Sequence, residues 1–221
     1  MKTEEIRNQI IEYKNRNLSL FTTSSFQSHS IVLLHILSTI DKTIPIYFIN
    51  TGYHFPETIS FKDKIVKLLD INVINLESFI PKNLQRDSYG NLLFTSDPDY
   101  CCFLNKVQPM ETLLLKYDVW INGIRGDQSA HRKKFQTEEV ANHNTLRYHP
   151  MLNWSSKDIY YYRMEHNLPA HPLEEKGYLS IGCEPCTRKF IGEDGRDGRW
   201  YGMNKSECGL NTDLVAKKET Y

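Results

Sequence analysis

Short apolar runs alternate along the chain with segments in which apolar residues recur at helical spacing. The runs predict strands over residues 18–26, 44–50, 71–78 and 118–126. The helical spacing predicts helices over residues 4–16, 29–40, 56–70 and 151–169. We expect Ser155 or Ser156 to cap the last helix, with Asp158 in its first turn. Strands that alternate with helices predict an α/β fold, in which helices cover both faces of a parallel sheet.

Two stretches depart from this alternation. The first follows the third predicted strand and leads into a helix that starts near the adjacent pair Cys101 and Cys102. The second follows Cys186 and is rich in glycine and charged residues. Such composition is typical of exposed, mobile segments rather than of a core. We therefore expect an α/β domain over residues 1–190 and a mobile C-terminal segment over residues 191–221.

Three loops lie where a predicted strand passes into the residues that follow it. Their sequences are TTSSFQSHS, NTGYHFPET and NGIRGDQSAHR. In open α/β sheets, ligands bind beyond the carboxyl ends of the strands. The hydroxyl groups and free N–H groups of the first loop could hold an anion at a helix N-terminus. Each loop alone is also compatible with an ordinary turn, and the chain has no Walker motif, but the three together favour a nucleotide site.

Charge and cysteine usage narrow the class of protein. The 221 residues include 27 Lys and Arg against 27 Asp and Glu, which argues against nonspecific binding to nucleic acid. No apolar run approaches the roughly 20 residues of a membrane helix, and the charged N-terminus lacks a signal-peptide core. We expect a cytoplasmic protein without membrane contact. In that reducing compartment, its five cysteines are expected to be ligands or catalysts rather than disulfides.

Four of the cysteines form two close pairs. Cys101 and Cys102 are adjacent, and Cys183 and Cys186 form a C-x-x-C. Structural zinc more often uses two C-x-x-C knuckles, whereas an iron–sulfur cluster accepts thiolates from successive residues. The cysteine spacing alone favours a cluster over zinc and zinc over unliganded thiols, and all three alternatives remain open. Redox dithiols also use the C-x-x-C spacing.

The sequence resembles the assimilatory adenylyl-sulfate (APS) and phosphoadenylyl-sulfate (PAPS) reductases from about Phe21 to about Leu210. The motifs that carry the resemblance are SSF, NTGYHFPET, CC-x-x-x-KV-x-P, W-x-NGIRGDQS-x-x-R, PMLNWSSKDIY, LPAHPLEEKGYLSIGCEPCTR, GRDGRW and ECGL. The resemblance implies a doubly wound sheet of the adenine-nucleotide α-hydrolase type. It also implies that Cys101, Cys102, Cys183 and Cys186 bind a [4Fe–4S] cluster, as in the branch of the family that mostly reduces APS.

The resemblance further implies a role for the fifth cysteine. Cys208, in ECGL, would be the nucleophile that attacks the sulfate of APS and becomes an S-sulfocysteine. A thioredoxin or glutaredoxin-like dithiol would then release sulfite. The resemblance also implies a set of substrate-binding residues: Ser24, Ser25, Gly123, Lys106, Arg132, Arg196 and Arg199. His143, His149 and His171 are expected to be structural, and a homo-oligomer is expected.

Some positions depart from the family pattern. Asn105 stands where relatives carry arginine, Gly126 replaces the second arginine of a pair, and Asn211 replaces the histidine of ECGLH. The nearest alternative is therefore a PAPS reductase. An ATP-dependent adenylating enzyme or sulfurtransferase of the same fold is a further alternative, but the chain lacks the glycine-rich S-G-G-x-D-S loop of such enzymes. A noncatalytic zinc-binding module is the third.

Overall fold

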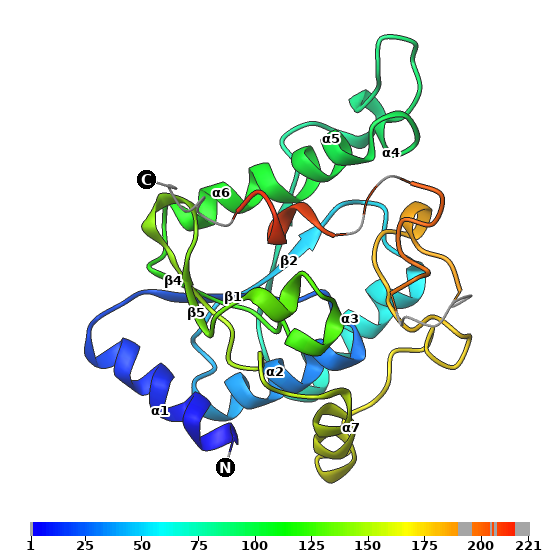
Figure 1. Cartoon of the computed structure of the whole chain (residues 1–221). Coiled ribbons are helices and arrows are strands. Elements are labelled where there is room, and N and C mark those ends of the chain that lie inside the picture. Colours follow the sequence, from blue (N-terminus) through cyan, green and yellow to red (C-terminus); the bar gives the residue numbers. More distant parts are fainter. Residues whose placement is uncertain (1, 190–195, 204, 206, 215–221) are drawn as a thin grey trace.

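A six-stranded sheet forms the centre of the molecule (Figure 1). The computed structural model describes residues 2–189, 196–203, 205 and 207–214. The strands are β1 (Leu20–Thr23), β2 (Ile46–Asn50), β3 (Val73–Glu77), β4 (Val119–Ile121), β5 (Glu138–Val140) and β6 (Leu146–Tyr148). Their order is β3-β2-β1-β4-β6-β5, and all neighbours are parallel except β5 and β6. The predicted α/β class is confirmed, and the strand order reverses between β1 and β4, where such sheets bind ligands.

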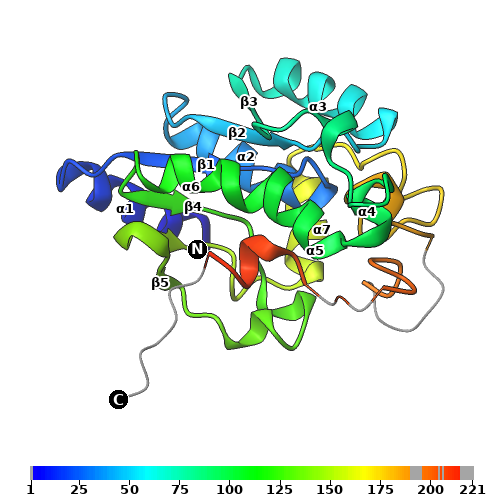
Figure 2. The same cartoon turned by 90° about the horizontal axis from the view of Figure 1, so that it is seen from above.

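Helices cover both faces of this sheet, as Figure 2 shows from above. One face packs against α1 (Lys2–Asn15), α2 (Ser28–Ile40), α3 (Pro56–Leu69) and α7 (Ser156–Glu165). The other face packs against α6 (Gln108–Leu114). Within the described ranges, no helix is both long enough and apolar enough to cross a membrane.

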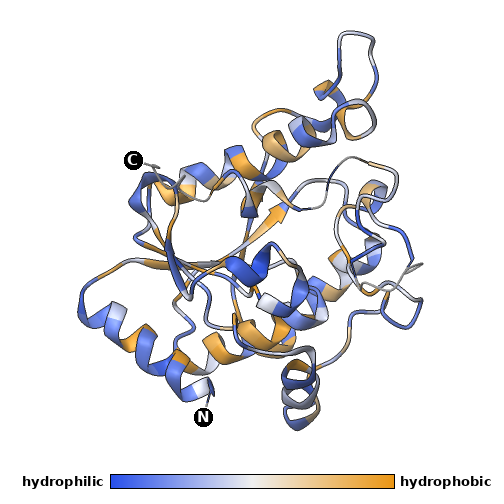
Figure 3. Ribbon diagram, viewed as in Figure 1, coloured by the Kyte–Doolittle hydropathy of each residue, from blue (hydrophilic) through white to orange (hydrophobic). Residues whose placement is uncertain are grey.

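Successive strand residues supply the two cores in turn, because side chains alternate across a strand. In β4, Val119 and Ile121 join the core beneath α2, whereas Trp120 joins the core beneath α6. Phe21 in β1 lies opposite Trp120 in the parallel register, and their rings stack 6.3 Å apart. Figure 3 shows α2 as largely hydrophobic, in keeping with its buried position, whereas α1 is polar on its outer side.

A run of helical turns carries the adjacent cysteines. It consists of α4 (Leu93–Ser96), α5 (Pro98–Cys102), the π-helix η2 (Phe103–Val107) and α6. The Asp97 carboxylate caps α5 by accepting a hydrogen bond from the Tyr100 N–H at 2.9 Å. Cys101 and Cys102 therefore lie near the start of a continuous helical run over residues 98–114, as predicted, and a π-turn follows them directly. The π-turn that follows them carries Lys106, and such turns occur frequently at functional sites.

The sequence pattern missed two features of the fold. Strands β5 and β6 have three residues each, too few to produce a readable alternation, and β5 adds an antiparallel edge. The described residues 207–214 also pack on the domain, with Leu214 fully buried in the core beneath α6. The mobility of residues 191–221 stays a prediction, and residues 191–195, 204, 206 and 215–221 lie outside the described residues.

The cap of α7 agrees with the prediction, although the helix is shorter than the predicted residues 151–169. Ser155 and Asp158 form a reciprocal capping box, in which the Ser155 hydroxyl accepts from the Asp158 N–H and the Asp158 carboxylate accepts from the Ser155 N–H. This pair satisfies two N–H groups that the first helical turn leaves without partners.

Candidate active site

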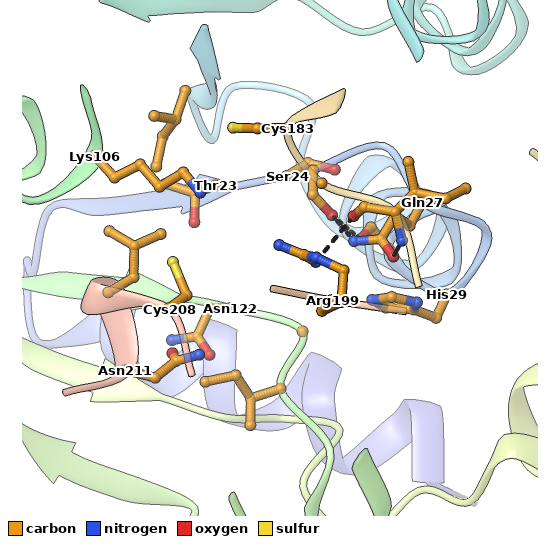
Figure 4. Close-up of a pocket in the computed structure, with 18 of the residues that line it drawn as sticks. Thr23, Ser24, Gln27, His29, Lys106, Asn122, Cys183, Arg199, Cys208 and Asn211 are labelled. Atoms are coloured by element: carbon orange, nitrogen blue, oxygen red, sulfur yellow. Dashed lines mark hydrogen bonds between the residues drawn. The ribbon is translucent and has the colours of Figure 1, made fainter. Parts of the chain in front are cut away.

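A pocket of about 190 Å³ opens at the carboxyl ends of β1, β2 and β4. Figure 4 shows its lining, to which the β1–α2 loop, the π-turn, the C-x-x-C loop and the C-terminal segment all contribute. Every residue to which the sequence analysis gave a catalytic or substrate-binding role lines this one pocket: Ser24, Ser25, Lys106, Gly123, Arg132, Arg196, Arg199 and Cys208. Segments almost 190 residues apart in the chain thus meet at the predicted edge of the sheet.

The loop after β1 is tied to the C-x-x-C loop. The Ser24 hydroxyl accepts a hydrogen bond from the Phe26 N–H at 3.1 Å, which fixes the tight turn into α2. The Gln27 side chain donates to the Ser25 hydroxyl at 3.2 Å and accepts from the Ile181 N–H at 2.8 Å. This hydrogen bonding holds the serine loop and the C-x-x-C loop against each other at the pocket wall.

Cys208 and Lys106 face each other across the pocket. In Figure 4 the Cys208 sulfur points toward the side of the pocket where the Lys106 side chain lies. Burial raises the pKa of Cys208, but the Lys106 ammonium group, the Leu210 N–H and the Arg199 guanidinium together outweigh this effect, and the pKa is lowered overall. Burial lowers the pKa of Lys106, but Cys183, Cys208 and Cys102 raise it by more. The pKa is therefore raised overall, and Lys106 stays charged. The pair therefore favours a thiolate at Cys208.

Two arginines of the C-terminal segment add positive charge. Arg199 lies against the C-x-x-C loop, where its Nη1 donates to the Ile181 carbonyl at 3.3 Å. A Cβ at Gly182 would overlap the Arg199 guanidinium, so the glycine lets this side chain cross the loop. Arg199 and Arg196 both lie over the Trp200 ring, at 4.5 and 5.5 Å. Their guanidinium groups are thereby held at the pocket wall.

Arg132 is already engaged by a carboxylate. Its Nε and Nη2 donate to the two Glu207 carboxylate oxygens, both at 2.8 Å, in a bidentate pair. Its Nη1 donates to the Gln128 side chain at 2.5 Å. Burial raises the pKa of Glu207, but Arg132 and Arg196 outweigh it and lower that pKa to about 2. Arg132 thus contacts the segment that carries Cys208.

The other four cysteines line a second, smaller cavity next to the first. Lys106 and Cys183 border both cavities. Among the described residues, no three His, Cys, Asp or Glu side chains converge closely enough to hold a single metal ion. The lining of the second cavity includes Cys101, Cys102, Cys183 and Cys186, together with Thr51, Tyr53 and Asn105.

Polar groups surround these four thiols. The Thr51 hydroxyl lies 3.3 Å from the Cys183 sulfur, and the Asn105 amide donates toward the Cys101 sulfur at 3.6 Å. Burial and the neighbouring thiols raise the pKa of Cys101 to about 12. Binding of a metal centre would reverse this preference, because a coordinated thiol is deprotonated.

Asn105, which departs from the family pattern, and Arg125, which precedes the departure at Gly126, both have structural roles. Asn105 is buried away from the larger pocket and exchanges hydrogen bonds with the Gln85 side chain, at 2.6 and 3.0 Å. Arg125 donates to Asp127 at 2.9 Å and to Ser156 at 3.0 Å, which links its loop to α7. Neither side chain lines the larger pocket.

Two functional candidates escaped the sequence analysis. Arg147 of β6 is buried in the pocket wall, stacked on Trp120 at 4.4 Å, with its Nη2 donating to the Asn211 side chain at 2.6 Å. Burial lowers its pKa to about 9. Nothing in the pattern around Arg147 marks it, because β6 is so short. Glu207 could have been found from its position beside Cys208.

The three histidines expected to be structural lie outside the lining of the larger pocket. His149 and His171 are fully buried. His149 Nδ1 lies 2.6 Å from the Asn122 side chain, and His171 Nε2 lies 3.1 Å from the Thr58 hydroxyl. Burial lowers the pKa of His149 to about 3 and that of His171 to about 4, so both rings are neutral at physiological pH.

Comparison with known proteins agrees with this geometry. Residues 19–189 match the phosphoadenosine phosphosulfate reductase domain family. The chain belongs to this family. The chain is 40% identical to adenosine 5'-phosphosulfate reductase of Streptomyces coelicolor over 184 residues, which cover 81% of this chain and 77% of that one. It is 36% identical to adenosine 5'-phosphosulfate reductase of Bacillus cytotoxicus over 204 residues, which cover 90% of this chain and 86% of that one. The predicted family resemblance is confirmed.

Solved structures of other proteins share the fold of this chain. The phosphoadenylyl-sulfate reductase from Candida auris, in a phosphate complex, superposes with a TM-score of 0.67 at 23% identity, covering 83% of this chain and 88% of that one. FMN adenylyltransferase from Candida glabrata superposes with a TM-score of 0.54 at 14% identity, covering 86% of this chain and 64% of that one. The adenine-nucleotide α-hydrolase type of sheet is thus confirmed.

Proposed function

We propose that the reductase converts adenylyl sulfate to sulfite and AMP, with electrons from a thioredoxin or glutaredoxin-like dithiol. The observation that carries this proposal is the Cys208 thiol, which faces Lys106 in a pocket that Arg196 and Arg199 also line. An anionic substrate and a thiolate nucleophile both need this positive charge. The named relatives, which are APS reductases, support the choice of substrate.

Binding would use the loops at the strand ends. Ser24, Ser25 and Gly123 come from the loops after β1 and β4 and would contact the nucleotide through hydroxyl and backbone groups. The guanidinium groups of Arg196 and Arg199 and the Lys106 ammonium group would hold the linked phosphate and sulfate. This arrangement would direct the sulfate toward Cys208, because Lys106 would contact the sulfate and faces that thiol.

The chemical step follows from a thiolate placed next to a sulfate. The Cys208 thiolate attacks the sulfur atom, so that an S–S bond forms while the bond from sulfur to the AMP phosphate oxygen breaks. The electron pair of that bond leaves on AMP, which departs as a phosphate anion stabilised by the same cations. Cys208 becomes an S-sulfocysteine, and no proton transfer is required in this step.

Release of sulfite would need an external dithiol. One of its thiolates attacks Cys208 Sγ, which breaks the S–S bond to the sulfonate group and sets sulfite free. The second thiol then resolves the mixed disulfide and restores the Cys208 thiol. The dithiol is oxidised to a disulfide and so supplies both electrons.

The four thiols of the smaller cavity fit a [4Fe–4S] cluster. They border one shared cavity without converging on a single point, which suits a cluster of several atoms better than one tetrahedral zinc ion. When bound, such a cluster would supply a fixed charged centre that fastens the Cys101–Cys102 turn to the C-x-x-C loop. Lys106, which borders both cavities, would hold its charge between that centre and the substrate.

A turnover assay on anaerobically purified protein tests this proposal. With reduced thioredoxin, we expect sulfite from both nucleotides but a higher kcat/KM for APS than for PAPS. Equal or better turnover of PAPS, with release of adenosine 3',5'-bisphosphate, would assign the chain to the PAPS reductases instead. Sulfite from neither nucleotide, together with ATP consumption, would favour an adenylating enzyme of the same fold.

A further inference from the structure

We propose that Glu207 is a positioning residue, whose carboxylate docks the segment 207–211 in the pocket and thereby holds the Cys208 thiol opposite Lys106. The inference rests on the proposed role of Cys208 as nucleophile. Glu207 is buried, although it belongs to the segment whose composition predicts exposure. A carboxylate is almost never buried unless it is paired.

The Glu207 carboxylate gathers contacts from three directions. From the domain it receives the bidentate pair with Arg132, both distances being 2.8 Å, and the Ser129 hydroxyl at 3.5 Å. From the preceding part of the C-terminal segment it receives Arg196 Nη2 at 3.2 Å. From its own turn it receives the Cys208 N–H at 2.9 Å and the Asn211 amide at 3.2 Å. One carboxylate thus joins the domain to both sides of the nucleophile.

The domain side of this contact is itself fixed. Arg132 is held by the Gln128 side chain at 2.5 Å, and its N–H donates to the Ser129 hydroxyl at 3.2 Å. The Gln128 side chain also accepts from the Arg125 N–H at 3.1 Å, so that the loop after β4 is braced internally. Arg132 therefore presents its guanidinium group to Glu207 in one orientation. It would serve catalysis mainly through Glu207 and not by direct contact with the sulfate.

A second set of contacts secures the other end of the turn. The Asn211 side chain accepts a hydrogen bond from Arg147 at 2.6 Å, and the Asn211 backbone carbonyl oxygen lies 2.9 Å from His131 Nε2. Between these ends, a Cβ at Gly209 would lie 2.9 Å from Val107 of the π-turn, so the segment packs closely against the element that carries Lys106. Cys208 lies between two anchored residues, Glu207 and Asn211, and its thiol has little freedom to leave Lys106.

The experiment uses the holoenzyme with Glu207→Gln, which keeps the shape of the side chain and removes its charge. Glu175→Gln, at an exposed glutamate, is the matched control. In the absence of substrate, the rate of Cys208 alkylation by iodoacetamide is followed against pH by peptide mass spectrometry. The charged or titratable groups that face Cys208 are Cys102, Lys106, Arg147, Arg196, Arg199, Lys205 and Glu207.

The two possible roles of Glu207 predict opposite shifts. If Glu207 docks the segment, its loss lets the thiol leave Lys106 and Arg199, and the pKa of Cys208 rises toward its ordinary value. If Glu207 is merely a nearby negative charge, its loss lowers the pKa of Cys208 further, because that charge raises it in the native protein. A raised pKa in Glu207→Gln supports the proposal, and a lowered or unchanged pKa overturns it.

A kinetic measurement separates positioning from binding. At saturating APS without thiol, we expect the single-turnover rate of AMP release to fall roughly 10-fold or more in Glu207→Gln, as expected for a misplaced nucleophile, with little change in AMP affinity. In Glu207→Asp, whose side chain is one methylene shorter, the single-turnover rate of AMP release should also fall. Equal rates in wild type and both variants would contradict the proposal. The alkylation result does not need APS, so a wild type that releases no AMP would overturn the proposed function and leave the docking role open to the pH measurement.

Discussion

At the scale of single residues, the chemistry depends on one ammonium group and one thiol. Lys106 borders both cavities and remains charged, because the thiols around it outweigh the effect of its burial. The pKa of Cys208 is lowered, whereas those of Cys101, Cys102 and Cys186 are raised. The sequence set Cys208 apart only by its neighbours in ECGL. The structure adds a physical difference between this thiol and the others.

Replacing the ammonium group should therefore change the pH dependence of the reaction. A thiolate is required, so kcat/KM should fall as the pH drops through the pKa of Cys208. In Lys106→Gln that pKa rises, because the main group that lowers it is gone, and the falling limb should move to higher pH. We also expect a loss of about 10²-fold or more at neutral pH, the scale of a removed transition-state contact. The pH profile of single-turnover AMP release measures both effects.

The control for this variant is Lys133→Gln, which removes an exposed lysine. It should keep the wild-type profile. A Lys106→Gln enzyme with slower turnover but an unshifted falling limb would contradict the assignment of Lys106 as the group that lowers the pKa of Cys208.

At the scale of elements, the site depends on the contact between the π-turn and the C-x-x-C loop. The π-turn follows Cys102 directly and brings Lys106 round to the pocket. The C-x-x-C loop is held by the segment that carries Arg199, since the Trp200 N–H donates to the Cys186 carbonyl at 2.9 Å. Both elements are short and irregular, so a centre that joins all four thiols would stabilise the pocket wall.

We expect a cluster that depends on four cysteines and not on the fifth. Anaerobically purified protein should be brown and contain about four iron atoms per chain. Replacing Cys101, Cys102, Cys183 or Cys186 by serine should bleach it, whereas Cys208→Ser should retain both colour and iron. Metal analysis and visible absorption check these outcomes. A colourless protein with one zinc per chain, after careful anaerobic handling, would refute the cluster.

At the scale of the whole molecule, the sequence predicted the sheet better than it predicted how the C-terminal segment packs on the pocket. Long periodic segments such as α2 and α3 lie close to their predicted bounds, because burial on one face imposes a readable period. The edge strands β5 and β6 are too short to show one. Loop sequences at strand ends predicted where the pocket lies, since parallel strands end at one edge.

The packing of the C-terminal segment could not be read from composition. Its glycines and charges predict exposure, yet Leu214 and Glu207 are buried, the first in the core beneath α6 and the second against Arg132. Both contacts join residues far apart in the chain, and no local period signals such partners. Arg147 was not predicted for the same reason, because its side chain pairs with Asn211, which is far away in the sequence.

The most direct test of the central claim is to mix the enzyme with APS in the absence of any thiol. One equivalent of AMP should appear, and peptide mass spectrometry should find a sulfonate on Cys208 and on no other cysteine. Reduced thioredoxin should then discharge the adduct as sulfite. Cys208→Ser should keep the cluster and APS binding but form no adduct, because a hydroxyl is a far weaker nucleophile at neutral pH. A Cys208→Ser enzyme that makes sulfite at close to the wild-type rate would contradict the mechanism.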